Sequence, residues 1–264
     1  MALRIISGVA LAAVALAVLL SGTPLMFFVF MGVFAALGLW EFFAMMKAGG
    51  EPSLPAAGIV FGLGLYAAMF FLGPEGFFML ASLALIAIFG AAPFSGATDA
   101  YRAAANTVFG IFYISLTFGS AALIRTLPDG AMITVMLALA NVLCDSLAYF
   151  TGRAIGKTPL APSISPKKTV EGFIGGFIGA VAGAVIIKIL FLPALALGHA
   201  AIAGVIVGIV GPAGDLAESA LKRKMMVKDS GSIIPGHGGA LDRMDSVMFN
   251  AAALYVYFKA VALA

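Results

Sequence analysis

The fold of this chain is decided by apolar segments such as residues 131–150, which read AMITVMLALANVLCDSLAYF. A helix of about 20 residues spans about 30 Å, which is the thickness of the hydrocarbon layer of a bilayer. Hydrophobic residues make up 62% of the 264 and charged residues only 10%, so the chain lacks the polar surface that a soluble domain of this length needs. The composition therefore indicates a helical membrane protein.

Apolar runs of this length recur along the whole chain. We predict spans near residues 3–20, 24–46, 56–72, 76–94, 104–124, 131–150, 171–192, 199–217 and 241–262. The expected fold is all-α, a polytopic membrane protein of about nine transmembrane helices. The first segment is expected to remain as a helix and not to be cleaved as a signal peptide, because the next span follows almost at once.

The basic residues predict the orientation of these spans. With nine spans, the N-terminus and every second loop lie on one side, and that side holds nearly all of the Lys and Arg residues. The other side has only Arg125 and Lys259, while Lys188 falls inside a span. Loops rich in Lys and Arg stay in the cytoplasm, so the basic side is expected to face it.

Most of the polar chemistry is expected in two segments on that side, residues 151–172 and 214–245. The chain is therefore divided into residues 1–130, N-terminal transmembrane helices with little polar chemistry, and residues 131–264, a catalytic transmembrane region. Series of glycines from Gly172 to Gly183 have small-residue spacing, which predicts close packing of the seventh span against a neighbouring helix.

Carboxylates in and beside these segments need an explanation. Asp145 lies deep in an apolar run, where a carboxylate costs a few kcal/mol unless it is paired or faces a polar cavity. An intramembrane polar contact is expected there, with Asn141 or Ser146 as a structural partner. Asp215 and Glu218 are spaced i, i+3, as are Asp242 and Asp245 (in LDRMDS), so each pair shares a helix face and can offer oxygen ligands to a hard cation.

Between the two acidic pairs lies a basic segment that contains PGHGG, residues 235–239. Glycine-rich backbone allows an anion to approach closely, and Lys and Arg surround it. Basic groups alone would suggest a polyanion or lipid headgroups, and carboxylates alone a cation pathway. Both together indicate a metal–phosphate site, in which Mg²⁺ bridges carboxylates and phosphate oxygens.

These residues resemble the bacterial phosphatidate cytidylyltransferases, or CDP-diacylglycerol synthases. The matching motifs are Ser219, Lys222-Arg223, Lys228-Asp229, Pro235-Gly236-His237-Gly238-Gly239 and Asp242-Arg243-Met244-Asp245, and upstream Asp145, Gly152-Arg153, Gly156-Lys157, Ser165-Pro166-Lys167-Lys168-Thr169 and Glu171-Gly172. The resemblance covers roughly the C-terminal half, with only Trp40-Glu41-Phe42 matching before it. Ala240 and Ser230 depart from the usual residues of the pattern, and neither is a charged position.

The resemblance implies that CTP and phosphatidic acid give CDP-diacylglycerol and pyrophosphate in phospholipid biosynthesis, in the cell inner membrane with the active-site loops toward the cytoplasm. It implies Asp215, Asp242 and Asp245 as a Mg²⁺ site, with a second cation compatible, and Asp215, Asp242 and Lys222 as catalytic residues. The implied substrate-binding residues are Arg153, Lys157, Lys167, Lys168, Arg223, Lys228, His237 and Arg243. Membrane lipids and a second copy of the chain are implied partners, and no nucleic acid is expected.

Two other functions stay open from the residues alone. A polyprenol or lipid kinase of related architecture would use similar phosphate-binding groups. An ion-coupled transporter would account for Asp145 and Lys188 within the membrane, but it would leave the basic loops beside carboxylate pairs unexplained. Incubation with labelled CTP, Mg²⁺ and phosphatidate separates these functions, because only a cytidylyltransferase forms a CDP-lipid.

Overall fold

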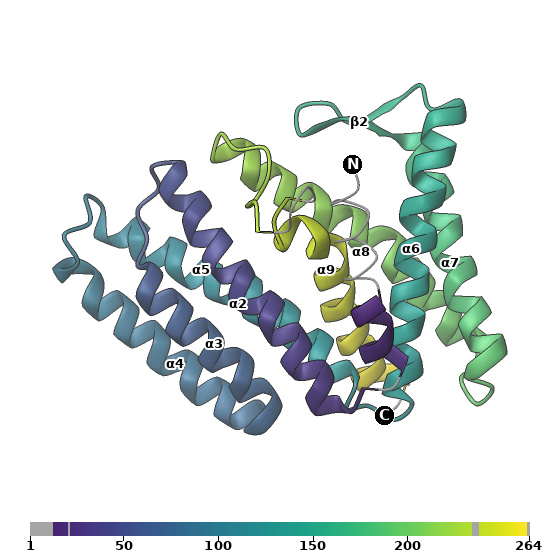
Figure 1. Cartoon of the computed structure of the whole chain (residues 1–264), viewed down its shortest axis with the longest axis horizontal. Coiled ribbons are helices and arrows are strands. Elements are labelled where there is room, and N and C mark those ends of the chain that lie inside the picture. Colours follow the sequence, from purple (N-terminus) through teal and green to yellow (C-terminus); the bar gives the residue numbers. More distant parts are fainter. Residues whose placement is uncertain (1–12, 21, 234–237, 263–264) are drawn as a thin grey trace. The chain divides into compact units, whose positions relative to one another are not determined.

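A computed structural model describes residues 13–20, 22–233 and 238–262, and these are predominantly helical (Figure 1). Residues 13–20 form a helical segment. The elements that follow are α2 (Pro24–Ala48), α3 (Pro55–Phe71), α4 (Gly73–Ala91), the 3₁₀ turn η1 (Ala92–Phe94), α5 (Ala100–Ile124), α6 (Gly130–Ile155), β1 (Pro159–Ala161), β2 (Ser165–Thr169), α7 (Val170–Phe191), α8 (Leu197–Lys224), α9 (Leu241–Tyr257) and the π-helical turn η2 (Phe258–Ala262). The all-α prediction is confirmed.

Six of these helices are long and apolar enough to cross a membrane, namely α2, α4 with η1, α5, α6, α7 and α8. Each coincides with a predicted span. The predicted count of nine is not confirmed by the described residues: α3 is apolar but shorter, α9 begins with charged residues, and most of the predicted span 3–20 lies outside the described residues.

The chain divides into two compact units, and α8 and α9 contribute to both. The first unit comprises residues 1–123 and 221–243, and the second comprises residues 124–220 and 244–264. This division differs from the expected boundary at residue 130, because residues 221–243 group with the N-terminal helices. Two close contacts within the first unit account for this: Met225 packs against Gly49, and Leu241 packs against Gly38.

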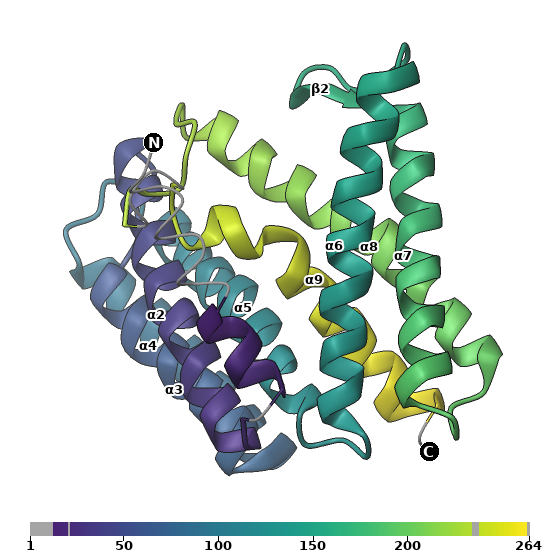
Figure 2. The same ribbon diagram turned by 45° about the vertical axis from the view of Figure 1, so that its right-hand side comes forward.

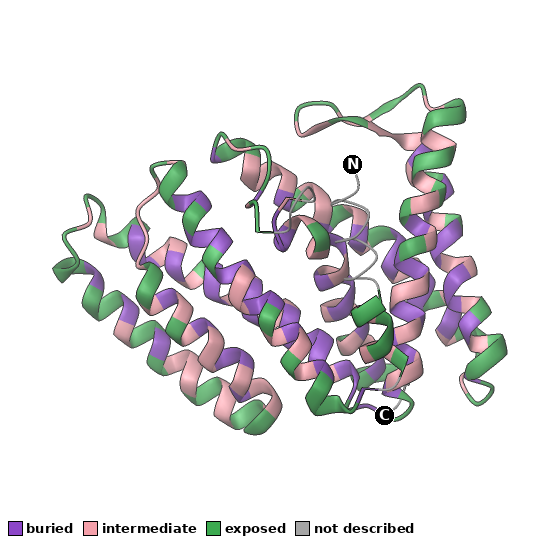
Figure 3. Ribbon diagram, in the orientation of Figure 1, coloured by how far each residue is buried: buried purple, intermediate pink, exposed green. Residues whose placement is uncertain are grey.

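In the first unit, α3, α4 and α5 share an apolar core around Leu65, Ile88 and Ile111. In the segment between α2 and α3, the backbone N–H of Leu54 donates to Thr107 Oγ1 of α5 at 2.8 Å. The outer side of α4 remains apolar, with Phe78 72% exposed (Figure 3). A soluble protein rarely leaves an apolar face of this kind open to water, so this face suits contact with lipid.

In the second unit, α6 and α7 lie side by side (Figure 2). Their contact depends on glycine, because a Cβ on Gly179 would lie 2.5 Å from the carbonyl oxygen of Leu143, and one on Gly183 would lie 2.8 Å from Cα of Ala140. The predicted close packing of the glycine series is thereby confirmed. Between the two helices the chain forms a small antiparallel hairpin, β1 paired with β2, which carries the Ser165–Thr169 motif.

Candidate active site

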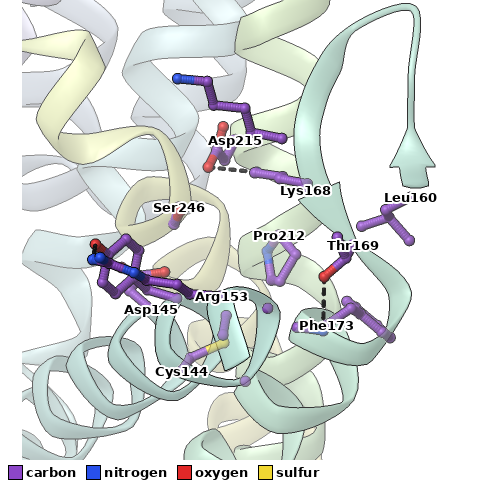
Figure 4. Close-up of a pocket in the computed structure, with 16 residues that line it drawn as sticks. Cys144, Asp145, Arg153, Leu160, Lys168, Thr169, Phe173, Pro212, Asp215 and Ser246 are labelled. Carbon is purple, nitrogen blue, oxygen red and sulfur yellow. Dashed lines mark hydrogen bonds and ion pairs between the residues drawn. The ribbon is translucent and has the colours of Figure 1, made fainter. Parts of the chain in front are cut away.

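A cavity of about 590 Å³ opens in the second unit, and we call it the polar cavity (Figure 4). Helices α6, α7, α8 and α9 and the hairpin all contribute to its wall. The charged or polar lining residues are Asp145, Tyr149, Arg153, Lys167, Lys168, Thr169, Asp215 and Ser246, and apolar residues such as Phe173 and Pro212 complete it. The cavity therefore combines carboxylates, cationic groups and an apolar wall.

Lys168 and Asp215 form the central ion pair of the polar cavity. Lys168 Nζ lies 2.5 Å from Asp215 Oδ2, and each side chain is about a third exposed, 29% and 31% respectively. The hydroxyl of Ser219, one turn further along α8, donates to Asp215 Oδ1 at 3.3 Å. The hairpin and α8 thus bring together two groups that lie 47 positions apart in the sequence (215 − 168).

Asp145 enters the same cavity from α6. Its Oδ2 accepts a hydrogen bond from Asn141 Nδ2 at 3.1 Å, and Asn141 Oδ1 accepts one from Asn250 Nδ2 of α9 at 2.8 Å. The predicted polar contact of Asp145 with Asn141 is therefore present. The charge of Asp145 also interacts with the charges of Asp245, Asp215 and Lys168. Asp145 is therefore within electrostatic range of two further carboxylates and of the ammonium group that contacts one of them, Asp215.

Local hydrogen bonds fix the hairpin that carries Lys167 and Lys168. Glu171, in the first turn of α7, accepts hydrogen bonds from the backbone N–H groups of Lys157 and Thr158 and from the Thr158 hydroxyl. Thr169 caps α7 by accepting a hydrogen bond from the Gly172 N–H at 3.1 Å. These contacts hold both ends of the hairpin, so the lysines between them project from a defined base.

The first unit contains a second polar cluster, centred on Asp242 at the start of α9. Its Oδ1 accepts a hydrogen bond from Lys222 Nζ at 2.5 Å, and its Oδ2 accepts from the backbone N–H of Ser230 and of Gly239, both at 2.9 Å. Burial alone would raise the pKa of Asp242, but the Lys222 ammonium and the two N–H groups outweigh it, so this pKa lies below its usual value. Asp242 is therefore held as a carboxylate.

Glu41 of α2 completes this cluster and is fully buried, with 0% exposure. Its Oε1 accepts a hydrogen bond from the Ala240 N–H at 2.8 Å, and its Oε2 accepts one from the Leu241 N–H at 2.9 Å. The Ser230 hydroxyl lies 3.1 Å from Glu41 Oε2 and 3.0 Å from Asp242 Oδ2. We call Glu41, Lys222, Ser230 and Asp242, with the N–H groups of residues 239–241, the loop anchor.

Two glycines of the motif are required by the loop anchor. Gly238 has φ +82°, in the left-handed region that glycine adopts at little cost. A Cβ on Gly239 would lie 2.1 Å from Ser230 Oγ and 2.6 Å from Glu41 Oε2. The backbone at Gly239 can therefore approach the carboxylate of Glu41 closely, and a side chain at this position would prevent that approach.

The structure brings some of the predicted site residues together and separates others. Arg153, Lys167, Lys168, Asp145 and Asp215 line the polar cavity, and Asp245 acts on Asp145 electrostatically. Lys222 and Asp242 belong to the loop anchor. The side chains of Lys157, Arg223, Lys228 and Arg243 are exposed, the first in the second unit and the others in the first. His237 lies outside the described residues.

The residues of the second unit fit a hard cation by their chemistry. Asp145, Asp215 and Asp245 offer the carboxylate oxygens that Mg²⁺ prefers, and Asp145 lies within electrostatic range of the other two. Within residues 13–20, 22–233 and 238–262, however, no three or more His, Cys, Asp or Glu side chains gather as a metal-binding group. The Mg²⁺ site of Asp215, Asp242 and Asp245 stays a prediction.

The sequence interpretation did not assign a role to Glu41. It is a single carboxylate in the apolar segment GLWEFFAM, so the argument applied to Asp145 applies equally to it. That argument would have predicted a polar partner for Glu41. It could not have named the partner, because the contacting N–H groups lie about 200 positions away in the sequence.

Residues 2–261 match the sequence model of the Cytidylyltransferase family. The chain belongs to the cytidylyltransferase family. Relatives named phosphatidate cytidylyltransferase include proteins of Bacillus subtilis (39% identity over 54% of each chain), Staphylococcus saprophyticus (40% over 55% of each) and Brucella abortus (42% over 56% of this chain and 55% of the relative). The chain thus aligns with about half the length of the curated relatives it matches. The polar cavity of this family member combines carboxylates with cationic side chains.

Proposed function

We propose that this protein is a phosphatidate cytidylyltransferase, which condenses CTP with phosphatidic acid to give CDP-diacylglycerol and pyrophosphate. The observation that carries the proposal is the polar cavity, where Asp215 meets Lys168 beside Arg153 and Lys167. Family membership and the names of its relatives support the same reaction. The apolar helices and the bacterial relatives support a multi-pass protein of the inner membrane.

The reaction joins two anions, so neutralisation of charge is the main task of the protein. An oxygen of the lipid phosphate attacks the α-phosphorus of CTP, the bond from that phosphorus to the bridging oxygen breaks, and pyrophosphate leaves. Lys168, Lys167 and Arg153 would hold phosphate oxygens, because cationic groups in a partly enclosed site stabilise the charge that develops there. The apolar wall around Phe173 would contact the part of the acyl chains nearest to the glycerol.

Mg²⁺ would be held by Asp215 with Asp245, and when bound it would supply positive charge to the phosphate oxygens. Asp242 is proposed as a further ligand from the family resemblance alone. Lys168 Nζ lies 2.5 Å from Asp215 Oδ2. When Mg²⁺ and substrate are bound, this ammonium group would shift from Asp215 toward a substrate phosphate. Asp145 also lines the cavity. The hydrogen bond from Asn141 would keep this second carboxylate directed into the cavity.

The site is proposed to face the cytoplasm, where CTP is available, as the excess of Lys and Arg on that side predicts. Membrane lipids surround the apolar faces, and a homodimer is proposed from the family alone. Lys222, with the exposed Arg223, Lys228 and Arg243, would add positive charge to the approach of the nucleotide.

The test is an assay of the purified, detergent-solubilised protein with labelled CTP, Mg²⁺ and phosphatidate. We expect a labelled CDP-lipid and an equal amount of pyrophosphate, and strong loss of both in Lys168→Met. Lys188→Met is the matched control, because Lys188 lies on α7 and does not line the polar cavity. Absence of CDP-lipid, with transfer of phosphate from ATP to a lipid alcohol, would replace the proposal by a lipid kinase.

A further inference from the structure

Glu41 is the only carboxylate of α2, and it lies in that helix among buried apolar residues such as Leu39 and Phe42. An ionisable group in such surroundings is strongly disfavoured unless its polar atoms are satisfied. Both oxygens of Glu41 accept hydrogen bonds, and the donors are the hydroxyl of Ser230 and the backbone N–H groups of Ala240 and Leu241. The carboxylate therefore serves the segment that joins α8 to α9.

This segment is the one that carries the family motif. We define the signature loop as the described residues 225–233 and 238–240. Glu41 contacts both described parts of it, at Ser230 and at Ala240. Two described parts of the loop are thus bound to the same side chain of α2, and the same Ser230 hydroxyl also donates to Asp242.

We propose that Glu41 is a positioning residue of the active site, which fixes the signature loop so that Asp242 and Lys222 keep their geometry. The inference rests on the proposed function, since Asp242 and Lys222 matter for catalysis only if the protein is a cytidylyltransferase. Glu41 is not among the residues that line the polar cavity. It acts through the N–H groups and the hydroxyl that it binds.

The geometry requires a carboxylate of this length. Oε1 and Oε2 each accept a backbone N–H, at 2.8 and 2.9 Å. Gln would place its NH₂ group against one of these N–H donors, and Asp, with one CH₂ fewer, would fall short of both by roughly 1.5 Å. The loop also approaches Glu41 too closely for a side chain at residue 231, because a Cβ on Gly231 would lie 2.6 Å from Glu41 Oε1.

The first experiment measures loop order independently of activity. Hydrogen exchange by mass spectrometry on the full-length protein in detergent follows a peptide that includes the Ala240 and Leu241 amides. We expect exchange at least 10-fold faster in Glu41→Gln than in wild type. Tyr66→Phe is the matched control: it removes a partly buried hydrogen bond to the carbonyl of Phe28, which lies near the N-terminal end of α2, whereas Glu41 lies near the C-terminal end. This control should leave this peptide unchanged.

The second experiment measures whether that order matters for catalysis. Glu41→Gln should lower kcat about 10-fold or more while the KM for CTP changes less than 3-fold, and Tyr66→Phe should keep kcat within 2-fold of wild type. If Glu41→Gln proves too unstable to purify, Ser230→Ala replaces it. This variant removes only the hydroxyl shared by Glu41 and Asp242, and it should lower kcat about 3-fold.

The outcomes separate the two proposals. Faster exchange with unchanged kcat, or unchanged exchange in both Glu41→Gln and Ser230→Ala, overturns the positioning role. Equal losses of kcat in Glu41→Gln and Tyr66→Phe overturn it as well, because the effect would then reflect stability of α2. A wild-type protein that makes no CDP-lipid would overturn the proposed function, and the exchange arm would still decide whether Glu41 orders the loop.

Discussion

Replacing Asp215 with Asn tests directly whether the polar cavity is the reacting site. The substitution keeps the shape of the side chain but removes the charge that Lys168 contacts at 2.5 Å. If Asp215 contributes to the stabilisation of charge in the transition state, kcat should fall severely. If Asp215 only forms a structural ion pair, the effect should be limited to stability.

The loss of a structural ion pair and the loss of charge at a reacting centre are expected to differ in size. Both side chains of the pair are about a third exposed, so solvent screens their attraction and the pair contributes about 1 kcal/mol or less to the free energy of unfolding. The 3.3 Å contact from Ser219 is long, and an Asn oxygen can still accept it. Loss of charge at the reacting centre costs about 2.7–4 kcal/mol in activation free energy, or 10²–10³ in kcat. Activity should therefore fall far more than stability.

The assay compares Asp215→Asn, Lys168→Met, the double variant and the control Lys188→Met, by formation of CDP-lipid and by thermal melting in detergent. Asp215→Asn should lower kcat about 10²-fold or more, with a melting temperature only a few degrees lower. Lys168→Met should chiefly raise the KM for CTP, about 10-fold. Independent roles predict that the two free-energy changes add in the double variant, whereas a mere ion pair predicts that the double variant equals either single one.

The reasoning is refuted if well-folded Asp215→Asn keeps kcat within about 3-fold of wild type. A rise of the KM for CTP in Lys188→Met as large as in Lys168→Met would also refute it. In that case the effect of Lys168 would reflect net charge and not its place in the polar cavity.

Other predictions follow from separate features of the fold. Asp242→Asn should lower kcat about 10²-fold or more and should also speed amide exchange at Gly239, because all contacts to its oxygens come from donors and an NH₂ group would face one of them; unchanged kcat would contradict this. Since the pKa of Asp242 is lowered in the fold, its carboxylate should contribute fully to stability above about pH 4–5, and this contribution should be lost progressively as the pH falls further. The melting temperature of Asp242→Asn should therefore decrease less on acidification than that of the wild type. Gly183→Val should overpack the contact with α6 and lower the free energy of unfolding by roughly 1–3 kcal/mol or more, so the melting temperature should fall markedly. Gly90→Val, at an open position on α4, should leave the melting temperature unchanged. A cysteine at Ser165 in a Cys144→Ala background should react with impermeant thiol reagents only in inside-out vesicles, and labelling of intact cells would contradict the topology.

Hydropathy and spacing were sufficient for much of the architecture. The six candidate spans agree with their predicted positions to within a few residues at most ends, because burial in lipid depends on consecutive apolar residues that the sequence displays directly. Similarly, the glycines at 179 and 183 predicted the close contact of α7, since only small residues permit backbones to approach so closely. The ends were less predictable, as with α8, which continues to Lys224, well beyond its apolar part.

The sequence also named most of the charged residues that the polar cavity brings together, but not their partners. Nothing in the order of residues indicated that Lys168 would lie on Asp215, or that Asp242 would be bound by the backbone N–H groups of Ser230 and Gly239. The assignment of residues 221–243 to the N-terminal unit was equally unexpected.

By itself, then, the sequence determined which six helices are long and apolar enough to cross a membrane and which charged residues are available to a site, because hydropathy, charge and spacing are local properties. Only the tertiary structure decided that Glu41 of α2 binds the signature loop through the N–H groups of Ala240 and Leu241. A backbone N–H is the same donor at almost every position in a chain. Which of them meets a buried carboxylate depends on the path of the backbone, and that path is set by the packing of all the helices together.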